Sequence, residues 1–258
     1  MPTGAITGYI DVAQIALYVF WAFFAGLIYY LHRENKREGY PLINERSKYV
    51  KVQGFPPVPE PKTFLLPHGG SVQAPRPNDL DQRPIKAKPV ANFLGAALQP
   101  TGNPMEDGVG PASYAPREDL PELTLEGLPM IVPLRIATDA KVADEDPDPR
   151  GMAVVGCDGK VGGTVKELWI DRAEPQIRYL EVATGGARAK TVLVPMTLAI
   201  VHGDRRQVVL ASVTGAQVAG APKIKSGDQI TKLEEDKVSA YFASSHLYAT
   251  PDRLGPIL

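Results

Sequence analysis

Residues 12–31 read VAQIALYVFWAFFAGLIYYL, a run of twenty residues without a charged side chain, and the next seven read HRENKRE. At about 1.5 Å per residue, a helix of this length spans roughly 30 Å, which matches the hydrocarbon thickness of a bilayer. Gln14 is the only strongly polar residue in the run. The stretch therefore predicts a single transmembrane α-helix over residues 12–31.

The charges that flank the run set its expected orientation. No Lys or Arg precedes Arg33, whereas basic residues follow the run closely. A secretory signal peptide would instead have a positive segment before a shorter apolar stretch, and a cleavage site of small residues after it. The positive-inside rule therefore predicts that residues 1–11 lie outside the cytoplasm and that the chain after the helix lies inside it.

The residues just beyond the run are expected at the level of the phospholipid headgroups. They are Arg33, Lys36, Arg37 and Tyr40. A basic side chain near an anionic membrane surface contributes about 1 kcal/mol of attraction, so at least one of the four is expected to contact a bound anionic lipid. The alternative is that the basic residues are topology signals alone.

Composition excludes several classes of function. The chain has 28 basic and 29 acidic residues, which gives no electrostatic footprint for nucleic acid. One cysteine, Cys157, rules out an intramolecular disulfide and fits a reducing compartment; its expected role is that of a small buried apolar side chain. The four histidines are scattered without metal-ligand spacing, and neither a phosphate-binding loop nor a serine nucleophile motif is present.

Residues 32–129 form the second segment, which is dense in Pro and Gly from about residue 39. Such composition excludes helices and long strand ladders. The segment also carries apolar residues, among them Phe55, Phe64 and Phe93. We expect an extended segment that lies along the surface of another protein, with a solvated linker as the alternative.

Residues 130–258 have the pattern of a mainly-β domain. Short β-branched runs separated by turn residues predict six strands: 131–137, 152–157, 164–170, 177–182, 191–194 and 207–212. Six short strands at this spacing suggest a small β-barrel or a curled sheet. The spacing Thr231, Glu234 predicts the start of a C-terminal helix, which Pro251 must end.

The chain closely resembles the H subunit of the purple-bacterial photosynthetic reaction centre, over nearly its whole length and in order. The resemblance is carried by FWAFFAGLIYYL (20–31), REGYPL (37–42), PKTFLLPHGG (61–70), PTGNPM (100–105), GVGPASY (108–114), DPRG (148–151), LWID (168–171) and LEEDKV (233–238). It implies one transmembrane helix beside the L and M subunits, a proline-rich segment over their cytoplasmic face, and a PRC-type β-barrel that caps the quinone sites.

The resemblance also implies partners, cofactors and a location. The L and M subunits bind bacteriochlorophyll, bacteriopheophytin, quinones, non-haem iron and carotenoid, so this chain is expected to ligate none of them and to be no enzyme by itself. Phospholipid is a further expected partner, and a light-harvesting ring and a cytochrome subunit are candidates. The implied location is the bacterial inner, intracytoplasmic photosynthetic membrane, with residues 1–11 in the periplasm.

The family places part of the proton path to the secondary quinone on a turn that corresponds to residues 171–178 here. Glu174 matches the carboxylate nearest the quinone pocket, Asp171 is a second candidate, and Arg178 is expected to hold these carboxylates electrostatically. Without the resemblance, Asp171 and Glu174 are ordinary hairpin charges.

One departure from the family lies between Glu122 and Leu128. Some members have an acid followed by two histidines where protons enter and inhibitory metals bind; here these positions are Thr124, Glu126 and Leu128. No metal site carries over. Proton uptake is expected at Glu126, Glu122 or His68, although a plain surface histidine is the simpler interpretation of His68.

Two other functions fit parts of the sequence. A stand-alone membrane-anchored β-barrel adaptor that recruits a soluble partner would share the helix and the domain, and bacteriochlorophyll absorbance in the purified protein would distinguish it from a reaction-centre subunit. An anchored enzyme fits less well, because no nucleophile or metal constellation is visible.

Overall fold

The computed structural model describes residues 4–38, 55–74, 81, 83–93, 96–186 and 189–254. The chain divides into two compact units. The first comprises Met1–Arg83 and Val90–Ala97, and the second comprises Pro84–Pro89 and Leu98–Leu258.

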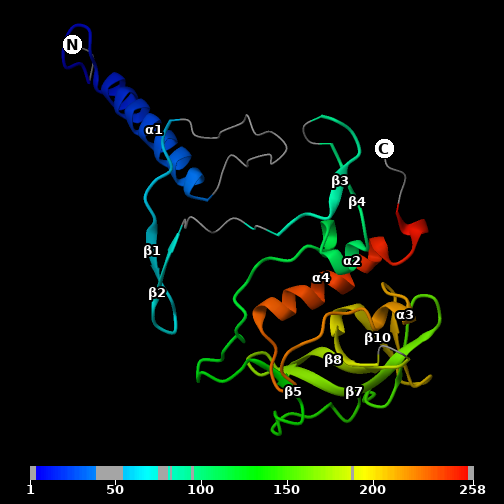
Figure 1. Ribbon diagram of the computed structural model, residues 1–258. Helices are drawn as coiled ribbons and strands as arrows, with labels where there is room; N and C mark the ends of the chain where they lie inside the picture. The colour runs from blue at the N-terminus through cyan, green and yellow to red at the C-terminus, as the bar shows by residue number, and fades with distance from the viewer. Residues whose placement is uncertain are drawn as a thin grey trace. The chain divides into compact units, whose positions relative to one another are not determined.

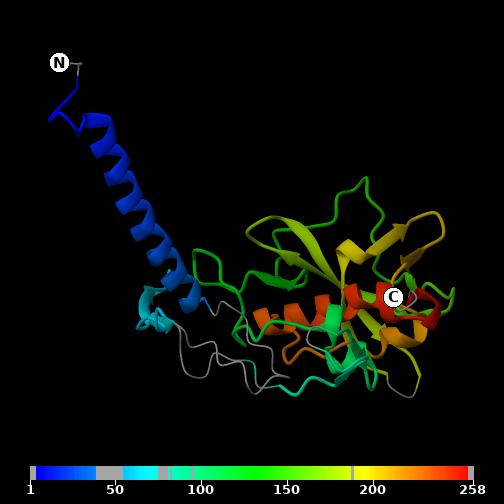
Figure 2. The same ribbon diagram turned by 90° about the horizontal axis from the view of Figure 1, so that it is seen from above.

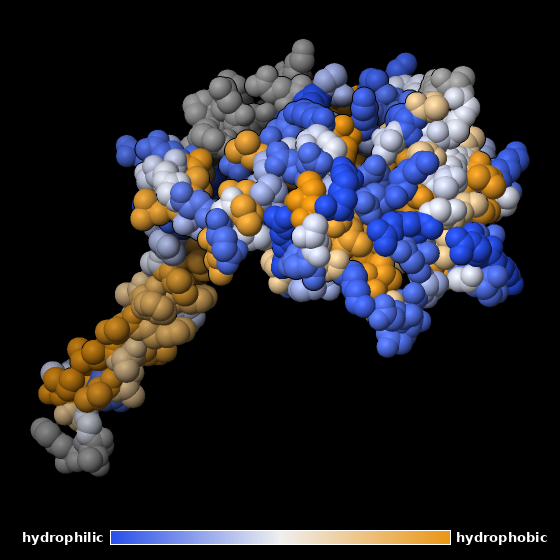
Figure 3. Space-filling model, turned by 90° about the horizontal axis from the view of Figure 1, so that it is seen from below, coloured by the Kyte–Doolittle hydropathy of each residue, from blue (hydrophilic) through white to orange (hydrophobic). Residues whose placement is uncertain are grey.

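The first unit begins with α1 (Val12–Arg37), which starts where the apolar run starts. The Asp11 side chain accepts a hydrogen bond of 2.7 Å from the Gln14 amide and caps the helix, and the Gln14 side chain donates to the Tyr18 hydroxyl. The helix continues past residue 31 because neither Pro nor Gly interrupts the charged turn that follows. Apolar side chains line the visible face of α1 (Figure 3), and none of its most apolar part is buried, as in a helix that crosses a membrane.

Two short antiparallel hairpins occupy the proline-rich segment. In the first unit β1 (Lys62–Leu65) pairs with β2 (Ser71–Ala74), and in the second β3 (Ala87–Pro89) pairs with β4 (Leu98–Pro100). Ladders of four and three pairs agree with the expectation that proline excludes long ones. The expectation that the segment has no helix is wrong at α2 (Pro104–Asp107), a single turn that begins with proline, where the missing amide hydrogen costs nothing.

The second unit is built around a seven-stranded sheet. Its strands are β5 (Ile131–Pro133), β6 (Ala153–Val155), β7 (Val161–Asp171), β8 (Gln176–Thr184), β9 (Thr191–Pro195), β10 (Ala199–His202) and β11 (Gln207–Leu210). The order is β10-β11-β6-β7-β8-β9, with β5 also paired to β7, and only β11 and β6 are parallel. Within the described residues no ladder joins β9 to β10, so the sheet is curled and open.

All six predicted strands are present, and one strand was missed. The first ends at Pro133 and not at residue 137, because the chain turns there: the Ile136 and Ala137 amides donate to the Pro133 carbonyl. The missed strand is β10, which follows the short helix η2 (Met196–Leu198) directly and has only four residues.

Helix α4 (Lys232–Tyr248) lies across the sheet (Figure 1). Its predicted capping box is confirmed: the Thr231 hydroxyl accepts from the Glu234 amide at 3.2 Å, and the Glu234 carboxylate accepts from the Thr231 amide at 3.0 Å. The helix ends before Pro251, as expected. Val238, Tyr241 and Phe242 join the core formed by the sheet.

The core recruits residues that precede the β-domain in the sequence. Met105, from α2 (Pro104–Asp107), belongs to the main cluster, and η1 (Gly110–Ala112) packs with α2 against α4. Figure 2 shows this packing from a second direction. The compact unit that holds the sheet therefore begins before residue 130.

Two glycines allow the β6–β7 turn to touch α3 (Gly215–Val218). A Cβ at Gly156 would lie 2.1 Å from the Gly215 nitrogen, and a Cβ at Gly215 would lie 2.4 Å from the Lys160 carbonyl oxygen. Only glycine permits this approach. The neighbouring Cys157 is exposed, which corrects the expectation that it is buried; it lies in the turn between β6 and β7.

Candidate functional site

The turn between β7 and β8 carries the two carboxylates that the sequence singled out. Asp171 is buried and accepts hydrogen bonds from the Ala173 amide at 2.9 Å and the Glu174 amide at 3.2 Å, so its carboxylate shapes the turn. Glu174 is exposed at the tip, where its carboxylate accepts from the Gln176 side chain at 3.3 Å. A buried acid therefore stands behind an exposed one.

Arg178 occupies an irregular position in β8. Trp169 pairs with Tyr179 and Ile170 pairs with Ile177, so Arg178 is an extra residue in the ladder. Such bulges re-aim a side chain and are frequent beside functional sites. In the described part of the chain, no hydrogen bond or ion pair joins Arg178 to Glu174. Its charge acts instead on Glu235.

Glu235, in the first turn of α4, is a titratable group that the sequence did not single out. The Tyr179 hydroxyl donates to its carboxylate at 3.2 Å. Burial raises the pKa of the Glu235 carboxyl; the Tyr179 hydrogen bond and the Arg178 charge oppose this, and the charge of Glu122 adds to it. Burial raises the pKa of Tyr179 as well, so this phenol keeps its proton.

A sequence signal for Glu235 does exist. It precedes the core residues Val238 and Phe242 by three and seven positions, which puts it on the apolar face of α4. A carboxylate on a face that packs against a sheet is partly desolvated. Desolvation disfavours the charged form and raises the pKa, so the carboxyl binds a proton more readily.

The loop that departs from the family pattern is a tight turn closed by the Leu123–Pro129 bridge. Thr124 is buried, and Glu126 is exposed near the tip of the loop. The Thr124 side chain lowers the pKa of Glu126 by hydrogen bonding, so this carboxyl is ionised at neutral pH. Glu122 is exposed at the base of the loop, and its negative charge raises the pKa of Glu235.

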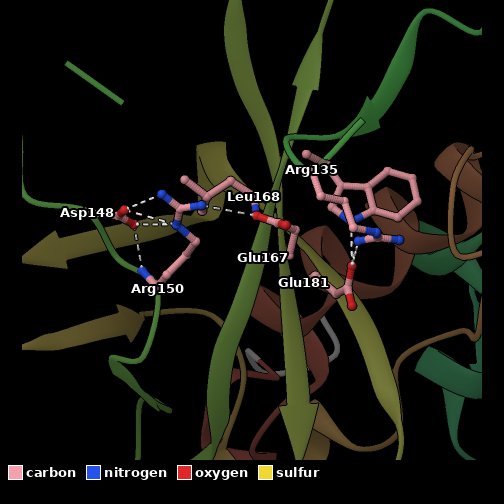
Figure 4. Close-up of polar contacts among 7 residues, drawn as sticks. Arg135, Asp148, Arg150, Glu167, Leu168 and Glu181 are labelled. Atoms are coloured by element: carbon pink, nitrogen blue, oxygen red, sulfur yellow. Dashed lines mark hydrogen bonds and ion pairs between the residues drawn. The ribbon is translucent and has the colours of Figure 1, made fainter. Parts of the chain in front are cut away.

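A second pair of carboxylates on the same hairpin is structural. Glu167 and Glu181 are cross-strand partners, and like charges in this position are unfavourable unless each is compensated. Arg150 approaches Glu167 at 3.6 Å and Arg135 approaches Glu181 at 3.4 Å (Figure 4). Glu181 also accepts a hydrogen bond of 2.9 Å from the buried Trp169 indole. The charges of both acids are therefore compensated within the domain, and Glu181 also satisfies a buried donor.

Two family models match the chain. The model described as photosynthetic reaction centre, H-chain N-terminal region, matches residues 4–136, more than half of the protein, and the PRC-barrel domain model matches residues 142–217. The chain belongs to the photosynthetic reaction centre H-chain family. The resemblance and the fold class inferred from the sequence are confirmed.

Membership has direct consequences. An H chain is a subunit of a reaction centre, which excludes a stand-alone adaptor. With one helix able to span a bilayer in the described residues, this H chain is a membrane-anchored, single-pass protein. Among the same residues, no three His, Cys, Asp or Glu side chains gather into a metal site.

The basic residues at the end of α1 mostly contact the chain itself. Lys36 is buried and donates to the Pro56 carbonyl, and Arg37 pairs with Glu34 at 3.1 Å. Arg33 is half-exposed. Tyr40 lies outside the described residues, so lipid contact by these four stays a prediction.

His68 lies in the turn between β1 and β2 and is exposed. It belongs to the first compact unit, whereas Glu122, Glu126 and Glu174 belong to the second. A role for His68 in proton uptake therefore stays a prediction.

Proposed function

We propose that this H chain caps the cytoplasmic face of the L and M subunits, stabilises their quinone sites and supplies part of the proton path to the secondary quinone. The observation that carries the proposal is the position of Glu174. Its exposed carboxylate stands at the tip of the β7–β8 turn, with buried Asp171 behind it. If a partner subunit covers this tip, the Glu174 carboxylate is enclosed at the surface of that partner.

The second support is the Glu235 group at the same end of the hairpin. Tyr179 follows Gln176, the first residue of β8 after the turn, by three positions, which is roughly 10 Å along a strand. Glu122, at the surface, is coupled electrostatically to Glu235, whose raised pKa lets it hold a proton more readily than an ordinary exposed carboxyl does. In this scheme Glu122 or Glu126 takes protons from water, Glu235 stores one, and Glu174 delivers protons to the partner.

The remaining roles follow the family. The quinone in the partner subunits is reduced by two electrons and takes up two protons. This chain ligates no cofactor and catalyses no reaction itself. Bacteriochlorophyll, bacteriopheophytin, carotenoid, quinones and non-haem iron belong to L and M. Residues 1–11 face the periplasm and the chain after α1 faces the cytoplasm. Exposed Ile85, Phe93 and Leu98 support contact between the proline-rich segment and those subunits.

The test is Glu174→Gln in the assembled complex. This change keeps the shape of the side chain and removes its titration. We expect a proton-coupled second electron transfer that is several-fold slower, with unchanged primary charge separation, measured by flash-induced absorbance. Glu122→Gln should have a smaller effect, and Glu145→Gln, exposed in a distant loop segment of the sequence, should have none. If the rate of the second electron transfer in Glu174→Gln is unaltered from mildly acidic to mildly alkaline pH, Glu174 is an ordinary surface charge with no role in proton transfer.

A further inference from the structure

After leaving α1 the chain returns to the end of that helix. The Lys36 ammonium donates to the Pro56 carbonyl, and the Arg37 guanidinium donates to the Glu60 carbonyl. The Lys62 ammonium closes the contact with an ion pair of 2.5 Å to Glu34. Residues 55–62 therefore run alongside the last turns of the helix.

This contact determines the depth of the returning segment relative to α1. The Phe55 ring lies 5.9 Å from the ring of Tyr29, centroid to centroid. Tyr29 stands just before the charged residues 32–38, at the boundary between the apolar and polar parts of α1. Phe55 is 81% exposed and Val58 is 53% exposed. Two apolar side chains are thus presented at the level where acyl chains meet headgroups.

The hairpin that begins at Lys62 continues this surface. Phe64 pairs with Val72 across the strands, and Thr63 pairs with Gln73. Because side chains alternate along a strand, Phe64 and Val72 share one face, while Thr63 and Gln73 share the other. The first face also carries Lys62 and Ala74, and the second also carries Ser71 and exposed Leu65. The Phe64–Val72 face therefore has two large apolar side chains next to each other, whereas the other face has one among polar residues.

Among the described residues of its own unit, the Phe64–Val72 face is only partly covered, because Val72 is half-buried while Phe64 is not. Every residue of β1 is exposed, and Phe64 keeps 48% of its surface accessible. An isolated two-stranded hairpin is marginally stable in water and needs an apolar surface to pack against. The ion pair of Lys62 with Glu34 holds the start of the hairpin at the end of the helix.

We infer that Phe55, Val58 and the Phe64–Val72 face form a second membrane contact, which lies in the interfacial layer of the bilayer at the C-terminal end of α1. The occupant is phospholipid, because the surface is continuous with the lipid-facing helix and its depth is set by contacts with that helix. Arg33 and Lys62, both partly exposed, would face anionic headgroups. The inference rests on the membrane-anchored H-subunit role and adds a surface to it.

The test places nitroxide spin labels in the full chain, in the assembled complex within vesicles of phosphatidylcholine and phosphatidylglycerol. Cys157→Ser provides the background, and single labels are placed by Val72→Cys and Gln73→Cys. We expect the label at 72 to collide mainly with oxygen, which concentrates in the bilayer, and the label at 73 to collide mainly with a water-soluble nickel chelate. Val161→Cys, exposed in the second unit, is the aqueous reference, and Val19→Cys, exposed on α1, is the bilayer reference.

Each other outcome has a definite meaning. If the labels at 72 and 73 both collide mainly with the nickel chelate, the hairpin lies in water. If neither reagent reaches the label at 72, a protein subunit covers this face. Either result overturns the lipid assignment while the label at 19 still reports the bilayer. A label at 19 that is accessible to nickel would instead contradict membrane anchorage by α1.

Discussion

The phenolic hydroxyl of Tyr179 on β8 donates a hydrogen bond of 3.2 Å to the carboxylate of Glu235 in the first turn of α4. The two residues are far apart in the sequence, and their contact joins the helix to the sheet. It also places a carboxyl in a partly desolvated setting where its pKa is raised. Stability and proton binding are therefore linked at this contact.

Glu235→Gln should change how stability depends on pH. Because burial raises the pKa of Glu235, the folded chain holds a proton that the unfolded chain releases above its own carboxyl pKa of about 4.3. The contribution of this group to stability is therefore largest below that pH and declines as pH rises through the folded-state pKa. The variant should unfold at a higher temperature than the native chain at neutral pH, with a smaller difference in acid. Thermal melts of the full chain in detergent, with Glu145→Gln as control, check this; equal pH slopes would contradict it.

Thr231→Ala should weaken the start of α4. The hydroxyl accepts from the Glu234 amide and donates to Asp119 at 2.9 Å, and its removal should cost about 1–2 kcal/mol of unfolding free energy. For a chain of this size, 1 kcal/mol corresponds to roughly 2–4 °C in the melting temperature. Thr231→Ser keeps the hydroxyl and should melt close to the native chain. Equal losses in both variants would show that the methyl group matters more than the cap.

Glu181→Ala should destabilise the sheet by removing the acceptor of a buried donor. Trp169 is fully buried, and its indole N–H donates to Glu181. An unpaired buried donor costs about 1–3 kcal/mol. Glu181→Gln retains an acceptor oxygen and should lose less. Chemical unfolding followed by tryptophan fluorescence would measure both, and a native-like midpoint for Glu181→Ala would refute this role.

Gly156→Ala should be the most damaging of these substitutions. Its Cβ would lie 2.1 Å from the Gly215 nitrogen, so backbone has to move, and we expect a loss of about 3 kcal/mol or more. Gly185→Ala is the matched control, since its Cβ meets nothing within 4 Å. Melting temperature and yield of folded protein are the measurements. Similar values for the two variants would mean that the turn adjusts freely.

The sequence by itself determined the features that depend on neighbours along the chain. The run 12–31 defines the spanning helix, because length and apolarity are local properties. The Thr231–Glu234 spacing locates the start of α4, because a capping box closes within one turn. The six predicted strands exist for the same reason, since β-branched residues between turn residues favour an extended chain wherever they occur.

Only the tertiary structure decided which of these elements meet. The strand β10 exists because β11 pairs with it, and the sheet is open because β9 and β10 form no ladder in the described residues. Cys157 is exposed although its neighbour Gly156 packs against Gly215. The same holds for the candidate site. The sequence pointed to Asp171, Glu174 and Arg178, but the burial of Glu235 against Tyr179 results from packing α4 on the sheet. Desolvation depends on which atoms surround a group in space, so it cannot be predicted from the order of residues alone.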